Sequence, residues 1–186
     1  GGHDVKEFTC DSLLNNMSMV FQNVYLFHDT IENNIKFGFP DATHEQVVEA
    51  AKKACCHEFI TALPDGYNTV IGEGGSTLSG GEKQRISIAR AMLKDAPIIL
   101  LDEATASVDP ENEVHLQQAI SSLVKDKTLI VIAHRLSTIR NADQILVVDD
   151  GKIVQRGTHD ELVKQKGIYQ NFWDIRQHAR NWKLAR

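Results

Sequence analysis

The stretch Leu78-Ser79-Gly80-Gly81-Glu82-Lys83-Gln84-Arg85 decides how the rest of the chain is interpreted. Ser79 is a favourable helix N-cap, and Glu82 three residues later completes a capping box. Apolar residues then recur at helical spacing as far as Leu93. The stretch therefore predicts a helix that begins at Ser79 and ends near Lys94.

The first turn of this helix carries Gly80 and Gly81, which a stable helix disfavours. Glycines leave the backbone N–H groups bare and allow another molecule to approach closely. A helix N-terminus of this kind binds anions, most often phosphate. By itself the stretch fits an ordinary capped helix equally well, and the motifs that follow favour the phosphate site.

A second motif is the apolar run Ile98–Leu101, which ends in Asp102 and Glu103. Such a run is typical of a buried parallel strand with carboxylates at its C-terminal tip, where ligands bind in open α/β sheets. One carboxylate can hold Mg²⁺ and the next can activate a water molecule. A later apolar strand, Leu129–Ala133, brings His134 to the same edge.

Taken in order, these motifs resemble the nucleotide-binding domain of an ABC transporter. The matching segments are Leu78–Gly81, Ile98–Glu103, Ala104–Asp109 and Ala133–Arg135, and the resemblance covers almost the whole chain. It implies an α/β fold, namely a P-loop NTPase (RecA-like) core with an α-helical subdomain. We expect the core to comprise residues 1–22 and 98–186, and the helical subdomain to comprise residues 23–97 and to end in the signature helix.

The resemblance also implies ATP and Mg²⁺ as ligands and assigns a role to each motif. The signature residues would contact the γ-phosphate of ATP that is bound to a second copy of the domain in a head-to-tail dimer. The signature residues are Ser79, Gly80 and Gly81. Asp102 and Gln22 would hold Mg²⁺, and Glu103 would act as general base. His134 would align the attacking water, and Asp109 would order the dimer contact.

The phosphate-binding loop of such domains, Gly-x-x-x-x-Gly-Lys-Ser/Thr, does not occur in this sequence. In the family this loop precedes the glutamine that Gln22 resembles. We therefore expect the chain to be the C-terminal portion of a longer protein, truncated at its N-terminus. We also expect that the isolated chain neither hydrolyses ATP nor binds it tightly.

The contexts Val24–Phe27 and Ile31–Ile35 resemble exporter half-transporters, in which a transmembrane domain is N-terminal in the same chain. The parent protein would then lie in a membrane, with this domain at the cytoplasmic face. The sequence departs from the usual family pattern at three positions. Val70 and Gly74 stand where exporters usually carry an acid and an arginine, and Glu82 stands where the family most often has glutamine. The alternatives are an SMC-type ABC ATPase, for which the chain lacks long heptad repeats, a non-catalytic regulatory module of ABC type, and a soluble translation-type ABC protein.

Bulk composition agrees with a single globular α/β domain. The 186 residues carry a formal net charge of −5, which argues against a nucleic-acid partner. Three cysteines do not form a disulfide framework and favour a reducing compartment. No apolar stretch approaches the roughly 20 residues that span a bilayer.

Overall fold

The computed structural model describes residues 2–75, 77–102, 110–133 and 136–181. The chain divides into two compact units, Gly1–Ile132 and Ala133–Arg186. In the described residues, the strands all fall within the predicted ATPase core (1–22 and 98–186) and none within the predicted helical subdomain (23–97), and this division stays a prediction.

The first unit contains a three-stranded parallel sheet in the order β1-β2-β3. Its strands are β1 (Met17–Val20), β2 (Ile98–Asp102) and β3 (Thr128–Ile132). Val20 pairs with Leu101 and Asp102 pairs with Ile132, so the three strands end at one edge. The parallel strands predicted from the apolar runs are confirmed. Each crossover contains helix, as parallel pairing requires, and α6 (Pro110–Val124) connects β2 to β3.

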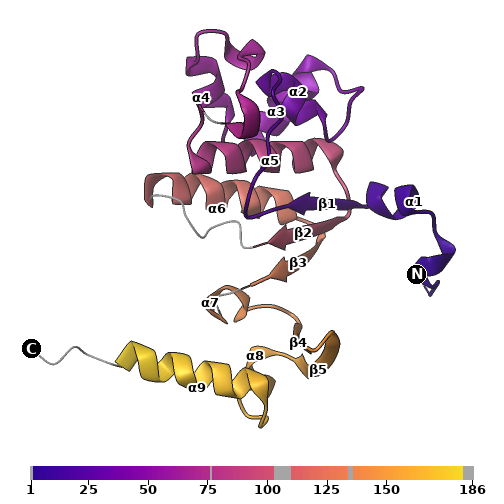
Figure 1. Ribbon diagram of the computed structural model, residues 1–186, viewed down its shortest axis with the longest axis vertical. Helices are drawn as coiled ribbons and strands as arrows, with labels where there is room; N and C mark the ends of the chain where they lie inside the picture. The colour runs from indigo at the N-terminus through magenta and orange to yellow at the C-terminus, as the bar shows by residue number, and fades with distance from the viewer. Residues whose placement is uncertain (1, 76, 103–109, 134–135, 182–186) are drawn as a thin grey trace, which may run out of the picture. The chain divides into compact units, whose positions relative to one another are not determined.

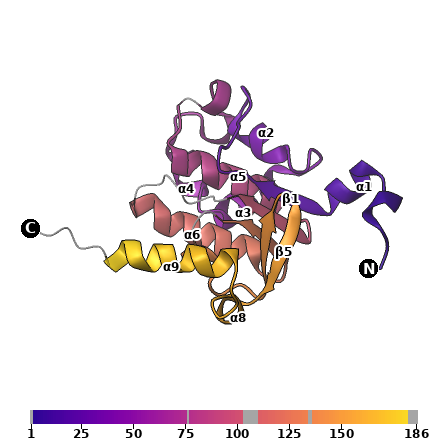
Figure 2. The same ribbon diagram turned by 60° about the horizontal axis from the view of Figure 1, so that its bottom comes forward.

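Helix α5 (Gly80–Lys94) is the centre of this unit. In both views α2 lies on one side of α5 and α6 on the other (Figure 1, Figure 2). Ile86, Ile88 and Ala89 are fully buried, because the helix packs against α2, α3, α6 and β1. The helix ends at Asp95, a C-cap in the left-handed conformation. Its predicted bounds are confirmed.

Three short α-helices lie between β1 and α5 in the described residues: α2 (Ile31–Lys36), α3 (His44–Lys53) and α4 (His57–Ala62). Two single 3₁₀ turns follow them, η2 (Gly66–Asn68) and η3 (Glu73–Gly75). The sequence predicted α3 as far as Cys56, but the helix ends earlier because Cys55 adopts a positive φ of 55°. Helix α2 was not predicted, although Thr30 caps it by accepting a hydrogen bond from the Asn33 amide.

The N-terminal residues differ from expectation. The sequence suggested a turn and a short edge strand, but residues Val5–Glu7 form a 3₁₀ turn, η1, followed by α1 (Cys10–Asn15). Helix α1 is capped by Thr9, which accepts from the Ser12 amide, and not by Asp11 as predicted. Thr9 is the N-cap because its hydroxyl reaches the amide of Ser12, three residues later, as an N-cap side chain must.

The second unit is a hairpin followed by two helices. Helix α7 (Leu136–Ile139) precedes the antiparallel strands β4 (Ile145–Asp149) and β5 (Lys152–Gly157), and α8 (His159–Leu162) and α9 (Ile168–Asn181) follow. The dipeptide Asp150-Gly151 predicts a hairpin turn, and the turn is confirmed, since both residues have positive φ. Thr158 and Glu161 predict a capping box that opens a helix to about Lys166; the box is confirmed, but α8 ends at Leu162.

Candidate functional site

The N-terminal end of α5 is built as the sequence predicted. The Ser79 hydroxyl accepts a hydrogen bond from the Glu82 amide at 3.3 Å, and the Glu82 carboxylate accepts one from the Ser79 amide at 2.8 Å. Ser79 and Gly80 are exposed, whereas Gly81 is buried. The amides at the first helical positions have no acceptor inside the helix, so they can bind an anion.

A second group of predicted residues lies at the carboxyl edge of the parallel sheet. Asp102 is the last residue of β2 and is partly buried, while Gln22 follows the end of β1 by two residues and is exposed. Because β1 and β2 pair in register, the two residues lie at the same edge of the sheet. Glu103, Asp109 and His134 lie outside the described residues.

The chemistry of this edge suits Mg²⁺. Asp102 offers a carboxylate and Gln22 an amide oxygen, both hard oxygen ligands. In the described part of the chain, no cluster of three or more histidine, cysteine or acidic side chains could hold a metal by itself. Mg²⁺ is usually bound by one or two protein oxygens together with phosphate and water.

The structure adds three polar residues that sequence reasoning missed. Gln84 and Arg90 on α5, together with Asn34 on α2, are buried or partly buried and form hydrogen bonds to the segment that follows β1. The sequence contained one signal for Gln84. It shares a helical face with Ile88 and Ala91, and a polar residue on a buried face needs a partner.

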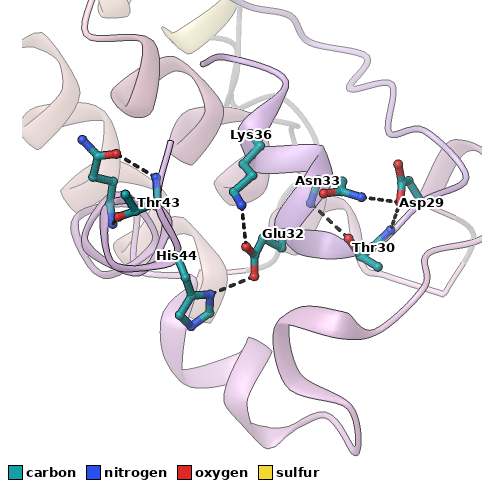
Figure 3. A network of polar contacts seen from close by, with 8 residues as sticks. Asp29, Thr30, Glu32, Asn33, Lys36, Thr43 and His44 are labelled. Atoms are coloured by element: carbon teal, nitrogen blue, oxygen red, sulfur yellow. Dashed lines mark hydrogen bonds and ion pairs between the residues drawn. The ribbon is translucent and has the colours of Figure 1, made fainter. Parts of the chain in front are cut away.

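A polar network joins α2 to α3 on the same unit (Figure 3). The Glu32 carboxylate pairs with the Lys36 ammonium and with Nδ1 of His44, both at 2.8 Å. Burial alone would raise the pKa of Glu32, but hydrogen bonds from Lys36 and His44 outweigh it and lower this pKa below its usual value. His44 is thus one of the contacts between two helices.

The next helix is tied in through aromatic contacts. The His57 ring on α4 lies with Nδ1 at 2.9 Å from the Tyr67 hydroxyl, and the Tyr67 ring also packs edge-on against His44. Burial raises the pKa of Tyr67, so its hydroxyl stays protonated at neutral pH. This network stabilises the helical layer that packs on α5.

In the described residues, no helix combines the length and the hydropathy that a membrane span requires. The family model for ABC transporters matches residues 1–106. The chain is similar to a putative multidrug export ATP-binding/permease protein, YgaD, of Bacillus subtilis strain 168. The two are 50% identical over 174 residues, which is 94% of this chain and 30% of that protein.

An ATP-dependent lipid A-core flippase of Legionella pneumophila is 49% identical over 179 residues, 96% of this chain and 30% of the flippase. The chain thus spans about a third of the length of the curated relatives it matches. A solved structure of a bacterial Atm1-family ABC exporter with ATP bound superimposes with a TM-score of 0.84 and 40% identity. It covers 100% of this chain and 32% of the exporter chain. The chain belongs to the ABC transporter family, as an exporter-type nucleotide-binding domain with the α/β fold of P-loop ABC ATPases.

Proposed function

We propose that this chain is part of the ATP-hydrolysing engine of a membrane exporter, at the cytoplasmic face of the membrane. In the complete protein two such domains would close head to tail on two ATP molecules. The observation that carries the proposal is the pair of features described above: an exposed, capped helix tip at Ser79, and oxygen ligands at the carboxyl edge of the sheet. Together they supply an anion site and a cation site, as a Mg²⁺–triphosphate requires.

In this proposal the two features act on different ATP molecules. The amides of Gly80 and Gly81 and the hydroxyl of Ser79 would bind the γ-phosphate of ATP held by the partner domain. Asp102 and Gln22 would hold Mg²⁺ on the ATP of their own domain. The bound ion would offset negative charge on the phosphate oxygens. Asp109 would order the contact between the two domains.

The proposed reaction is hydrolysis of the terminal phosphoryl group. Water attacks the γ-phosphorus, the bond to the bridging oxygen breaks, and ADP and inorganic phosphate leave. The Glu103 carboxylate takes the proton from the attacking water, and His134 holds the γ-phosphate and Glu103 in line. Positioning and charge neutralisation supply most of the acceleration in phosphoryl transfer, so no covalent intermediate on the protein is needed.

The dimer partner and the transmembrane domain couple this cycle to transport. ATP would favour the closed dimer because it contacts both domains, and hydrolysis would remove that preference. The chain matches 30% of the length of each of these relatives, and we propose that a membrane domain fused to it is the second partner.

The decisive experiment uses the complete exporter polypeptide that carries this sequence, with Glu103→Gln. We expect the rate of ATP hydrolysis to fall by roughly 100- to 10,000-fold, the usual contribution of general acid–base catalysis to a rate. ATP binding should persist, and closed dimers should accumulate. Glu113→Gln, the same chemical change at an exposed position of α6, serves as the control. A wild-type protein that binds ATP without hydrolysing it would indicate a regulatory module. Full turnover in the Glu103 variant would remove that residue from its role.

A further inference from the structure

The segment that contains Gln22, residues 21–27, is hydrogen-bonded to α5 on both sides of that residue. On the upstream side, Nε2 of Gln84 donates to the carbonyl oxygen of Phe21 at 3.2 Å. Gln84 is only 3% exposed. A buried side-chain amide that loses its acceptor costs free energy, so this bond holds the backbone next to Gln22 in place.

On the downstream side, Arg90 of α5 holds the same segment. One of its terminal nitrogens donates to the carbonyl oxygen of Tyr25 at 3.4 Å, and its Nε donates to the carbonyl oxygen of Asn34 at 2.9 Å. The Asn34 side chain in turn accepts from the Phe27 amide at 2.9 Å and donates to the Phe27 carbonyl at 3.0 Å.

Close packing supports these bonds. Gly38, just after α2, lies so near the carbonyl of Arg90 that a Cβ atom there would collide with it. The Arg90 guanidinium also lies over the Phe27 and Phe37 rings, at 5.8 and 5.3 Å from their centroids. The segment is therefore fixed to one helix, the same helix whose N-cap is Ser79.

From this arrangement we propose that Gln84 is a positioning residue for Gln22. It holds the backbone beside Gln22, so that the cation ligand and the anion-binding tip of α5 move as one body. The inference rests on the proposed function only for the role of Gln22. The contact between Gln84 and the segment does not depend on it.

The first test reads the backbone of the nucleotide-free, full-length protein by hydrogen–deuterium exchange. Gln84→Met keeps an unbranched buried side chain but removes the donor. We expect peptides covering residues 21–27 to exchange about fivefold faster, the factor that corresponds to one lost buried hydrogen bond. The control is Lys94→Met, because the Lys94 ammonium donates to the carbonyls of Leu14 and Met17, both at 2.7 Å, outside the segment. It should leave exchange of residues 21–27 unchanged.

The second test is a double-mutant cycle on the Mg²⁺ concentration that half-saturates ATP hydrolysis. Gln22→Ala and Gln84→Met should each raise it severalfold, and the double variant should resemble Gln22→Ala, since residues that act through one another are not additive. Lys94→Met should leave this concentration unchanged in either background. Should Gln84→Met fail to fold, Gln84→Glu keeps the shape and also lacks the donor at neutral pH.

The outcomes separate the two proposals. Absence of hydrolysis in the wild-type protein would defeat the proposed function, while the exchange result would still decide the positioning contact. Unchanged exchange in residues 21–27, or a full additive effect of Gln84→Met on top of Gln22→Ala, would overturn the role of Gln84 even in an active ATPase.

Discussion

The guanidinium of Arg90 donates from Nε to the carbonyl oxygen of Asn34 at 2.9 Å and joins α5 to α2. Burial lowers the pKa of Arg90 to about 10, so it is still charged at neutral pH. Carbonyl oxygens and two aromatic faces compensate this charge. The planar fork of an arginine can serve all these partners at once.

Arg90→Lys should therefore destabilise the fold although it keeps the charge. A lysine ammonium cannot reproduce the forked hydrogen bonds or the stacking, and we expect a loss of about 1–3 kcal/mol in the free energy of unfolding. Urea unfolding of the full-length protein followed by circular dichroism measures it. Arg156→Lys at an exposed position of β5 should change stability by less than about 0.5 kcal/mol. Equal effects at the two positions would contradict the role assigned to the Arg90 fork.

Glu82→Gln tests the departure from the usual signature sequence. A glutamine oxygen can still accept from the Ser79 amide, so the capping box should persist. Loss of a negative charge in the first turn should lower the stability of the helix by about 0.3–1 kcal/mol. The same charge repels the phosphates of ATP, so its loss should lower the KM for ATP about two- to fivefold, which corresponds to the same free energy. Steady-state ATPase kinetics and thermal unfolding give the two numbers.

The control for this change is Glu58→Gln, an exposed acid in the first turn of α4. It removes the same kind of favourable interaction with a helix N-terminus and should leave the KM unaffected. An unchanged or higher KM in Glu82→Gln would show that this charge does not oppose ATP binding.

Glu32→Gln should change the dependence of stability on pH. The pKa of Glu32 is lowered in the folded state, so its ionised form stabilises the fold above the ordinary carboxyl pKa of 4.5, and this contribution is lost as the pH falls from 4.5 through the lowered pKa. The difference in unfolding free energy between wild type and variant should thus be full at pH 6–7 and should shrink as the pH falls below 4.5.

Glu49→Gln is the matched control, because Glu49 pairs with Lys52 on the exposed face of α3 with side chains 62% and 52% exposed. Exposed pairs contribute little, so this variant should show almost no pH-dependent difference. A difference for Glu32→Gln that stays constant from pH 7 to pH 3 would contradict the assignment. Chemical unfolding at each pH supplies the measurement.

Cys56 should be unreactive in the folded protein. Its side chain is fully buried, and burial raises the pKa of its thiol to about 12, so almost no thiolate forms near neutral pH. Cys10 is exposed and should react with a charged thiol reagent much faster than Cys56. Mass spectrometry after brief labelling at pH 8 distinguishes them. Rapid native-state labelling of Cys56 would mean that the core around α3 and α4 opens readily.

Local chemistry made much of this structure predictable. The helix from Ser79, its capping box and the parallel strand ending at Asp102 all depend on residues that are neighbours in sequence. Hydrophobic periodicity and N-cap chemistry act over one or two turns, so they can be read directly. The same holds for the Asp150-Gly151 turn of the second unit.

The errors have the opposite origin. Helix α2 has only six residues, too few for periodicity to be clear, and it is stabilised by contacts with α5. The end of α3 depends on the positive φ of Cys55, which no pattern of polar and apolar residues encodes.

The sequence alone indicated the family, the parallel strands, helix α5, and which residues are candidates for binding phosphate and Mg²⁺. Only the tertiary structure revealed that Gln84 and Arg90 form hydrogen bonds to the backbone on either side of Gln22. The carbonyls that they contact lie more than sixty residues earlier in the sequence. A hydrogen bond between a buried side chain and a distant carbonyl depends on the three-dimensional path of the backbone. That path is set by the packing of whole helices on the sheet and leaves no periodic trace in the sequence.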